Sequence, residues 1–179
     1  MQKTAFYLML FLSISYLTSC TSRVQHADPF YNFTDDYGWT IKHIPLIEPI
    51  EVTGVLGEYP WAVSIDYGLW VSIPNDQGLV FYAYGIDELE KFAVENDVIL
   101  AYSEYVDVDA DAYIRDNYFH WFVLVPDQEF AEGFHTEAEF LAYIQTLDIQ
   151  DPNWQTPDEA YQQFKRTGCL AWFPDCEQP

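Results

Sequence analysis

Residues 118–125 read Tyr-Phe-His-Trp-Phe-Val-Leu-Val, and this stretch decides the predicted fold. Aromatic and β-branched residues, which are enriched in strands, make up most of it. Apolar side chains fall on both of its alternating faces, which is typical of a strand that is covered on both sides. We therefore predict a strand in the middle of a sheet, from Tyr118 to Val125.

Shorter strand patterns precede this stretch, each bounded by Pro, Gly, Asn or Asp. We expect strands at residues 39–44, 50–56, 61–65, 69–73, 79–84, 86–94 and 98–105. Pro45 should end the first of them. Asp-Tyr-Gly at 66–68 should form a tight hairpin, and Glu-Asn-Asp at 95–97 a second turn. A short helix begun by Asp87 with Glu90 is the alternative for residues 86–94.

The hydrophobic period changes near the C-terminus. Thr136 with Glu139, and Thr156 with Glu159, each have the spacing of a capping box at a helix start. We expect two short helices, at about 136–147 and 157–166. Because strands come first and helices last, we predict an α+β fold, mainly antiparallel β-sheet with two short C-terminal helices.

The N-terminus carries Leu17-Thr18-Ser19-Cys20 at the end of an apolar run. As a helix the run at 5–17 would rise about 20 Å, against a hydrocarbon core of about 30 Å, so it is too short to span a membrane. The segment resembles the signal peptide of bacterial lipoproteins. An ordinary secretory signal in which Cys20 is incidental is the alternative.

The lipoprotein resemblance implies a domain organisation and a location. Residues 1–19 would be removed, Cys20 would carry the lipid (a diacylglyceryl group and a palmitate-type acyl chain), and residues 20–36 would form a tether to one globular domain at 37–179. Thr21 after the cysteine resembles lipoproteins of the outer membrane of Gram-negative bacteria, on its periplasmic face or at the surface. Residues 121–124, 133–134 and 136–140 resemble small uncharacterised bacterial lipoproteins, which implies no activity.

The composition is strongly acidic, with 29 Asp and Glu against 7 Lys and Arg and a net charge of −22. Such a charge repels nucleic acid and favours a basic protein partner or divalent cations, unless it only solvates the surface. Half of the residues are hydrophobic (50 %), which excludes a disordered acidic chain.

Two further cysteines, Cys169 and Cys176, are predicted to form a disulfide, because disulfides persist outside the cytoplasm. A catalytic thiol is disfavoured, since no His lies near either residue in the sequence.

The best candidate for a metal motif is Asp107-Val108-Asp109-Ala110-Asp111, which opens like an EF-hand loop. The later positions do not match an EF-hand loop, because Ala112 stands where the loop needs Gly and Tyr118 stands where it needs Glu. We expect an acidic strand end, with a weak calcium site as the alternative, and no cofactor. The four His show no zinc spacing, and His120 is expected to be a hydrogen-bonded structural residue.

The sequence contains no nucleophile elbow and no glycine-rich phosphate loop. It is rich in aromatic residues, with 6 Trp, 14 Tyr and 13 Phe, which suit core packing, a protein interface or stacking on sugar rings. We therefore expect a non-catalytic, lipid-anchored envelope protein that binds a protein partner. The alternatives are a glycan-binding component and, less favoured, a hydrolase that uses acidic residues.

Overall fold

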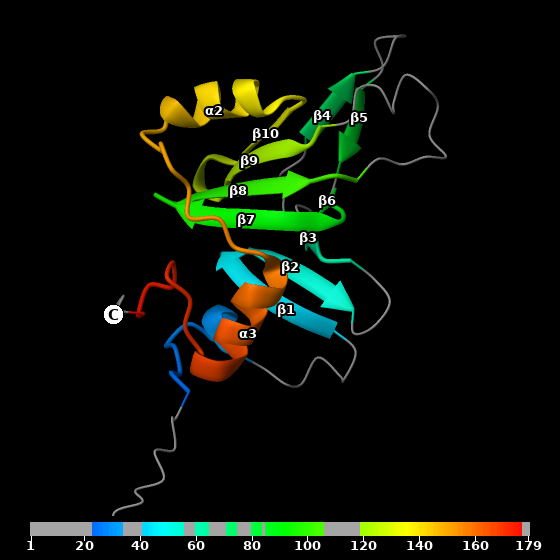
Figure 1. The fold of residues 1–179 in the computed structure, drawn as a ribbon. Helices are drawn as coiled ribbons and strands as arrows, with labels where there is room; N and C mark the ends of the chain where they lie inside the picture. The colour runs from blue at the N-terminus through cyan, green and yellow to red at the C-terminus, as the bar shows by residue number, and fades with distance from the viewer. Residues whose placement is uncertain are drawn as a thin grey trace, which may run out of the picture.

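The computed structural model describes residues 23–33, 41–55, 60–64, 71–74, 80–83, 85–105 and 119–176. They form two four-stranded antiparallel sheets, a two-stranded hairpin and two α-helices, so the predicted α+β class is confirmed (Figure 1). Cys20 with its lipobox, the predicted hairpin turn at 66–68, and Asp107, Asp109 and Asp111 lie outside the described residues. Within the described part, no helix has the length and apolar character to cross a bilayer.

The first sheet has the strand order β1-β2-β3-β6. Its strands are β1 (Ile41–Ile47), β2 (Ile50–Val55), β3 (Ala62–Ser64) and β6 (Gly85–Ile86). The prediction that Pro45 ends the first strand is wrong, because β1 continues through Pro45 to Ile47 with a register shift between the two. An edge strand tolerates proline, since one of its sides needs no backbone donor.

The second sheet has the order β10-β9-β8-β7. Its strands are β7 (Leu89–Glu95), β8 (Val98–Ser103), β9 (Trp121–Val125) and β10 (Phe130–Phe134), with the 3-10 turn Pro126–Gln128 between the last two. The predicted central strand lies inside the sheet as β9, paired with β8 and β10. Residues 86–94 form strand rather than helix, but not one strand as predicted, because β6 ends at Ile86 and β7 begins at Leu89 in the other sheet.

The predicted hairpin between residues 61–65 and 69–73 is not the pairing found. β3 pairs with β2 and β6, whereas β4 (Val71–Pro74) pairs with β5 (Val80–Ala83) as a separate hairpin. Because β3 has only three residues and neighbours on both sides, it has no edge left for β4.

Three layers build the core (Figure 1). Side chains of β7, β8 and β9 alternate between two apolar clusters, one under α2 (Glu137–Gln145) and one against the first sheet and α3 (Pro157–Thr167). Phe122 and Leu124 face one cluster, and Trp121 and Val123 face the other. The second sheet is therefore buried on both faces, as the apolar pattern of residues 118–125 predicts.

Both helices begin where the capping boxes predict. The hydroxyl groups of Thr136 and Thr156 accept from the backbone N–H groups of Glu139 and Glu159, whose carboxylates bond back to the threonines. Gly168 ends α3 with φ +75°, a left-handed conformation that glycine adopts without strain.

Residues 23–33 are packed against the domain, which differs from the tether predicted for residues 20–36. The backbone N–H of Val24 donates to the carbonyl of Thr167 at 3.1 Å. A 3-10 turn, Pro29–Tyr31, is capped by the Asp28 side chain. Tyr31 and Phe33 pack on the apolar cluster that includes α3. The apolar residues within this polar stretch supply the contacts that bind it.

Candidate functional site

A groove of about 410 Å³ opens where the approach to β3, the start of β7 and the first turn of α3 meet. Segments far apart in the sequence form it, because Gln155 pairs with Phe92 of β7 just before α3 begins. Its lining combines one indole ring with three carboxylates: Pro60, Trp61, Glu88, Leu89, Glu90, Thr156, Pro157 and Asp158.

Trp61 forms the aromatic wall of this groove, and three contacts fix it. Its carbonyl accepts from the backbone N–H of Leu89 at 2.7 Å. Its indole Nε1 donates to Oδ1 of Asp158 at 3.3 Å. Its ring lies over Gly54, where a Cβ atom would come within 2.7 Å of it. The position of the indole therefore depends on the absence of a side chain at residue 54.

The ammonium group of Lys42 already lies against this indole wall. Its Nζ lies 5.2 Å from the centre of the Trp61 ring and 5.4 Å from that of Tyr161. The same nitrogen is 3.7 Å from Oδ1 of Asp158. These are distances at which an ammonium group is attracted to an aromatic face.

Glu88 and Glu90 contribute the remaining charge. Both are exposed, and they flank the buried Leu89. Glu88 has φ 49°, an uncommon backbone conformation for a residue with a side chain. The turn lies between the end of β6 in one sheet and the start of β7 in the other. This turn, which connects the two sheets, thus places the carboxylates of Glu88 and Glu90 at the groove.

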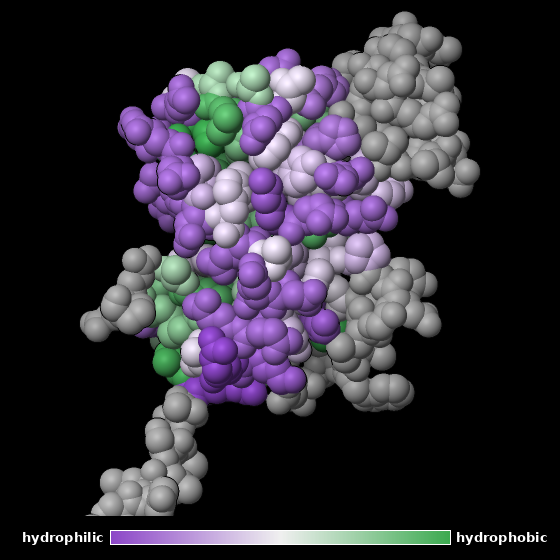
Figure 2. Space-filling view, viewed as in Figure 1, coloured by the Kyte–Doolittle hydropathy of each residue, from purple (hydrophilic) through white to green (hydrophobic). Residues whose placement is uncertain are grey.

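Basic side chains in the described part of the chain are largely engaged with rings. Nζ of Lys91 lies 4.7 Å from the ring centre of Trp154, 4.8 Å from that of Trp121 and 5.2 Å from that of Tyr102. Arg23 lies 4.4 Å over the ring of Phe33. Figure 2 shows a largely hydrophilic face with a few apolar patches.

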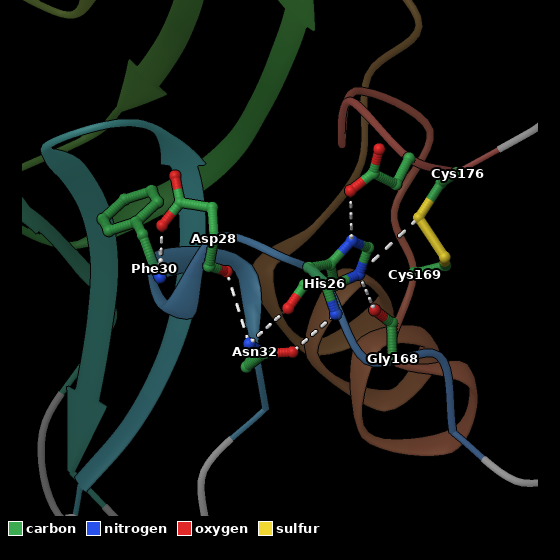
Figure 3. A network of polar contacts seen from close by, with 8 residues as sticks. His26, Asp28, Phe30, Asn32, Gly168, Cys169 and Cys176 are labelled. Atoms are coloured by element: carbon green, nitrogen blue, oxygen red, sulfur yellow. Dashed lines mark hydrogen bonds and ion pairs between the residues drawn. A yellow bond between two sulfur atoms is a disulfide. The ribbon is translucent and has the colours of Figure 1, made fainter.

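A second polar cluster lies where residues 23–33 meet the C-terminal segment (Figure 3). The His26 side chain is fully buried, with Nε2 at 2.7 Å from the carbonyl oxygen of Gly168 and 3.9 Å from Sγ of Cys176. On the other side of the ring, Nδ1 lies 3.9 Å from Oδ2 of Asp175 and has no hydrogen-bond partner.

The structure joins Cys169 and Cys176 by a disulfide, in the pairing predicted for them. It also brings His26 to this pair, although no histidine is close to it in the sequence. His120 is hydrogen-bonded as expected, with Nδ1 2.9 Å from the carbonyl oxygen of Ser103. No protein-family model matches this chain, and no curated protein or solved structure gives a significant match.

Proposed function

We propose that this chain is a lipid-anchored, non-catalytic binding protein of the cell envelope, and that its groove receives a basic side chain of a protein partner. The observation that carries the proposal is the arrangement of Glu88, Glu90 and Asp158 around the indole of Trp61. A guanidinium group can stack on an indole and pair with carboxylates at once, so arginine suits such a groove best.

The position of Lys42 supports this proposal from within the molecule. Its ammonium group occupies the junction of Trp61 and Asp158, so one wall of the groove stabilises a cation in the folded protein. Glu88 and Glu90 lie on the other side and are exposed to solvent. The net charge of −22 would add long-range attraction for a basic partner and speed its association.

The glycan-binding alternative receives less support from the tryptophans of the described residues. Trp121 is buried, Trp154 packs on it at 5.9 Å, and Trp172 packs on Phe92 at 5.6 Å. Rings that pack on other rings offer little free face to a sugar. Trp61 is the exception, because it lines the groove, and its indole Nε1 already donates to Asp158.

The proposed lipid at Cys20 would hold the domain close to the membrane. Residues 23–33 are bound to the domain, so only the three residue-to-residue steps from Cys20 to Arg23 separate the lipid from packed structure. Three residues span at most about 10 Å. Incorporation of labelled palmitate into the wild type but not into Cys20→Ser tests the anchor, and equal labelling of both would contradict it.

The groove is tested with the variant Glu88→Gln/Glu90→Gln/Asp158→Asn. Its control is Glu132→Gln/Glu137→Gln/Asp151→Asn, which removes the same charge from exposed positions outside the groove. Each variant changes one acid in the first turn of a helix, Glu137 in the control and Asp158 in the groove variant. A partner captured from envelope extract is purified and titrated against the wild type and both variants, at about 0.1 M and about 1 M salt.

We expect the groove variant to weaken binding about tenfold or more, and high salt to weaken binding by the wild type. The control variant should bind like the wild type at the same salt concentration. A partner that binds both variants equally well would show that it uses another surface. Binding that is insensitive to salt would remove the electrostatic basis of the proposal.

A further inference from the structure

His26, Cys169 and Cys176 form a cluster whose ligand atoms all lie within 4.8 Å of one another. One nitrogen and two sulfurs are donors that thiophilic metals, zinc above all, prefer. The three residues come from the two ends of the described chain, since His26 lies in the docked N-terminal segment and the cysteines follow α3. The cluster is separate from the acidic groove.

The imidazole ring is oriented with Nε2 toward the sulfurs. Nε2 lies 3.9 Å from Sγ of Cys176. In a tetrahedral site with bonds of about 2.0 to 2.3 Å, a nitrogen and a sulfur ligand lie roughly 3.6 Å apart. The nitrogen is thus near the distance of a ligand, and both the disulfide and the hydrogen bond from Nε2 to Gly168 must be broken before the three residues can bind one metal.

The unpartnered Nδ1 is a second, independent observation. The Gly168 carbonyl can only accept, so Nε2 carries the proton of that hydrogen bond, and Nδ1 is the ring nitrogen left without a partner. This buried atom has no hydrogen-bond partner and faces Oδ2 of Asp175 at 3.9 Å. A proton on Nδ1 would be stabilised by this carboxylate. To bind a metal, Nε2 must give up its proton and its hydrogen bond to Gly168, and a proton on Nδ1 would then face Asp175.

We propose that reduction of the Cys169–Cys176 disulfide converts this cluster into a zinc site with His26 as the third ligand. Nε2 would bind the metal, and Asp175 would accept from Nδ1–H, which is the order of a carboxylate–histidine–zinc arrangement. The rings of Phe173 and Tyr31, 5.2 Å and 6.3 Å from the imidazole, limit access of water to one side.

The reaction balances with an external dithiol, the class of reductant that thiol–disulfide oxidoreductases supply. The dithiol gives two electrons and two protons, its own sulfurs join as a disulfide, and the Cys169–Cys176 bond becomes two thiols. Zn²⁺ then replaces the two thiol protons, which go to solvent, and the proton on Nε2 moves to Nδ1. Three protein ligands leave one tetrahedral position for a water molecule or another ligand.

Zinc in this position would keep residues 23–33 attached to the C-terminal segment after the disulfide is lost. The disulfide joins only Cys169 to Cys176, whereas the zinc site would also bind His26. The metal would therefore replace a crosslink within one loop by a crosslink between the two ends of the domain.

The test uses the full chain with Cys20→Ser, in mild detergent, so that Cys169 and Cys176 are the only thiols. The protein is reduced with a phosphine, which is then removed without air, and Co²⁺ is added as the spectroscopic probe. We expect one Co²⁺ per reduced chain, with thiolate-to-cobalt absorption and the intense visible bands of tetrahedral cobalt, and displacement of cobalt by Zn²⁺. The oxidised protein and Cys169→Ser/Cys176→Ser should show neither band.

Two variants distinguish this site from adventitious thiolate binding. Asp175→Asn should weaken zinc binding by about 10- to 100-fold, whereas Asp151→Asn should leave it unchanged. Asp175 has a side chain that is 58 % exposed, so its replacement should not impair folding. His26→Gln should change the visible cobalt bands. The proposal is overturned if the reduced protein gives no thiolate–cobalt absorption, or if His26→Gln and Asp175→Asn both bind like the unmutated site.

Discussion

The imidazole Nε2 of His26 donates a hydrogen bond of 2.7 Å to the carbonyl oxygen of Gly168, across 142 positions in the sequence. The bond ties the N-terminal segment to the end of α3. Asn32 supports it, since its side-chain oxygen accepts from the backbone N–H of His26 at 2.7 Å. Residues 23–33 are therefore fixed to the domain by buried polar contacts as well as by the apolar rings of Tyr31 and Phe33.

Gly168→Ala should release this segment. A Cβ atom at residue 168 would lie 2.6 Å from the carbonyl oxygen of Val24, and φ is +75°. The left-handed backbone alone costs a non-glycine residue about 1–2 kcal/mol, and the clash adds to it. We expect a loss of about 2 kcal/mol or more in urea unfolding and faster tryptic cleavage after Arg23.

Gly85→Ala is the matched control, because its Cβ would meet only the carbonyl oxygen of Val63, at 3.2 Å, and its φ is not positive. It should cost less than Gly168→Ala and leave the cleavage rate after Arg23 unchanged. Equal cleavage of Gly168→Ala and the wild type would show that the segment is not held at this position.

Gly54→Ala should displace the wall of the acidic groove. The new methyl group would lie 2.7 Å from Cε3 of Trp61, so the indole must move away from Asp158 and Lys42. Overpacking of this kind costs about 1–3 kcal/mol. In a Trp61→Ala background the same substitution should cost less, with a coupling of about 1 kcal/mol in a double-mutant cycle of urea unfolding. Additive effects would contradict the contact.

Local signals in the sequence predicted the turn at 95–97 and both helix starts, but not the continuation of β1 through Pro45 or the partners of β3. Asn96 and Asp97 both have positive φ, 53° and 61°, as the turn at 95–97 requires. The caps at Thr136 and Thr156 need only residues three positions apart. Such features depend on neighbours in the chain, so a single sequence contains the information for them.

Contacts set by tertiary packing were not predicted. His26 lies in a polar stretch without a hydrophobic period, and its partners are at Gly168 and beyond, so no local pattern marks the histidine cluster. The groove is likewise formed by segments that are far apart in the sequence. One signal was available: Asp28 before Pro29 repeats the cap-and-proline pattern of Thr156-Pro157, which indicates an ordered turn within the predicted tether.

Lys91→Met should destabilise the domain, although the substitution places no polar group among the rings around residue 91. The ammonium lies within 5.2 Å of three ring centres, those of Tyr102, Trp121 and Trp154. Cation–π attraction at a half-buried position contributes about 0.5–2 kcal/mol. Urea unfolding should show a loss in this range and altered tryptophan fluorescence. Lys165→Met, at an exposed position of α3, should leave the fluorescence unchanged. A fluorescence change as large in the control would argue against a specific cage.

The capping boxes should make the helix starts sensitive to acid. The Thr136 hydroxyl, followed by its backbone N–H, lowers the pKa of Glu139. For Glu159 the order is reversed, with the backbone N–H of Thr156 as the larger cause of the lowered pKa. A carboxylate whose pKa is lower in the folded state stabilises folding above its unfolded pKa, and this contribution is lost as pH falls through the folded pKa.

Substitution by alanine removes only the hydroxyl and keeps the backbone donor. Thr136→Ala should therefore raise the pKa of Glu139, and Thr156→Ala that of Glu159, as NMR titration of the two carboxyl groups can measure. Loss of an N-cap hydroxyl should also lower the free energy of unfolding at neutral pH by about 1 kcal/mol in each variant. A glutamate whose pKa does not change in its variant would contradict the hydrogen bond from the threonine hydroxyl.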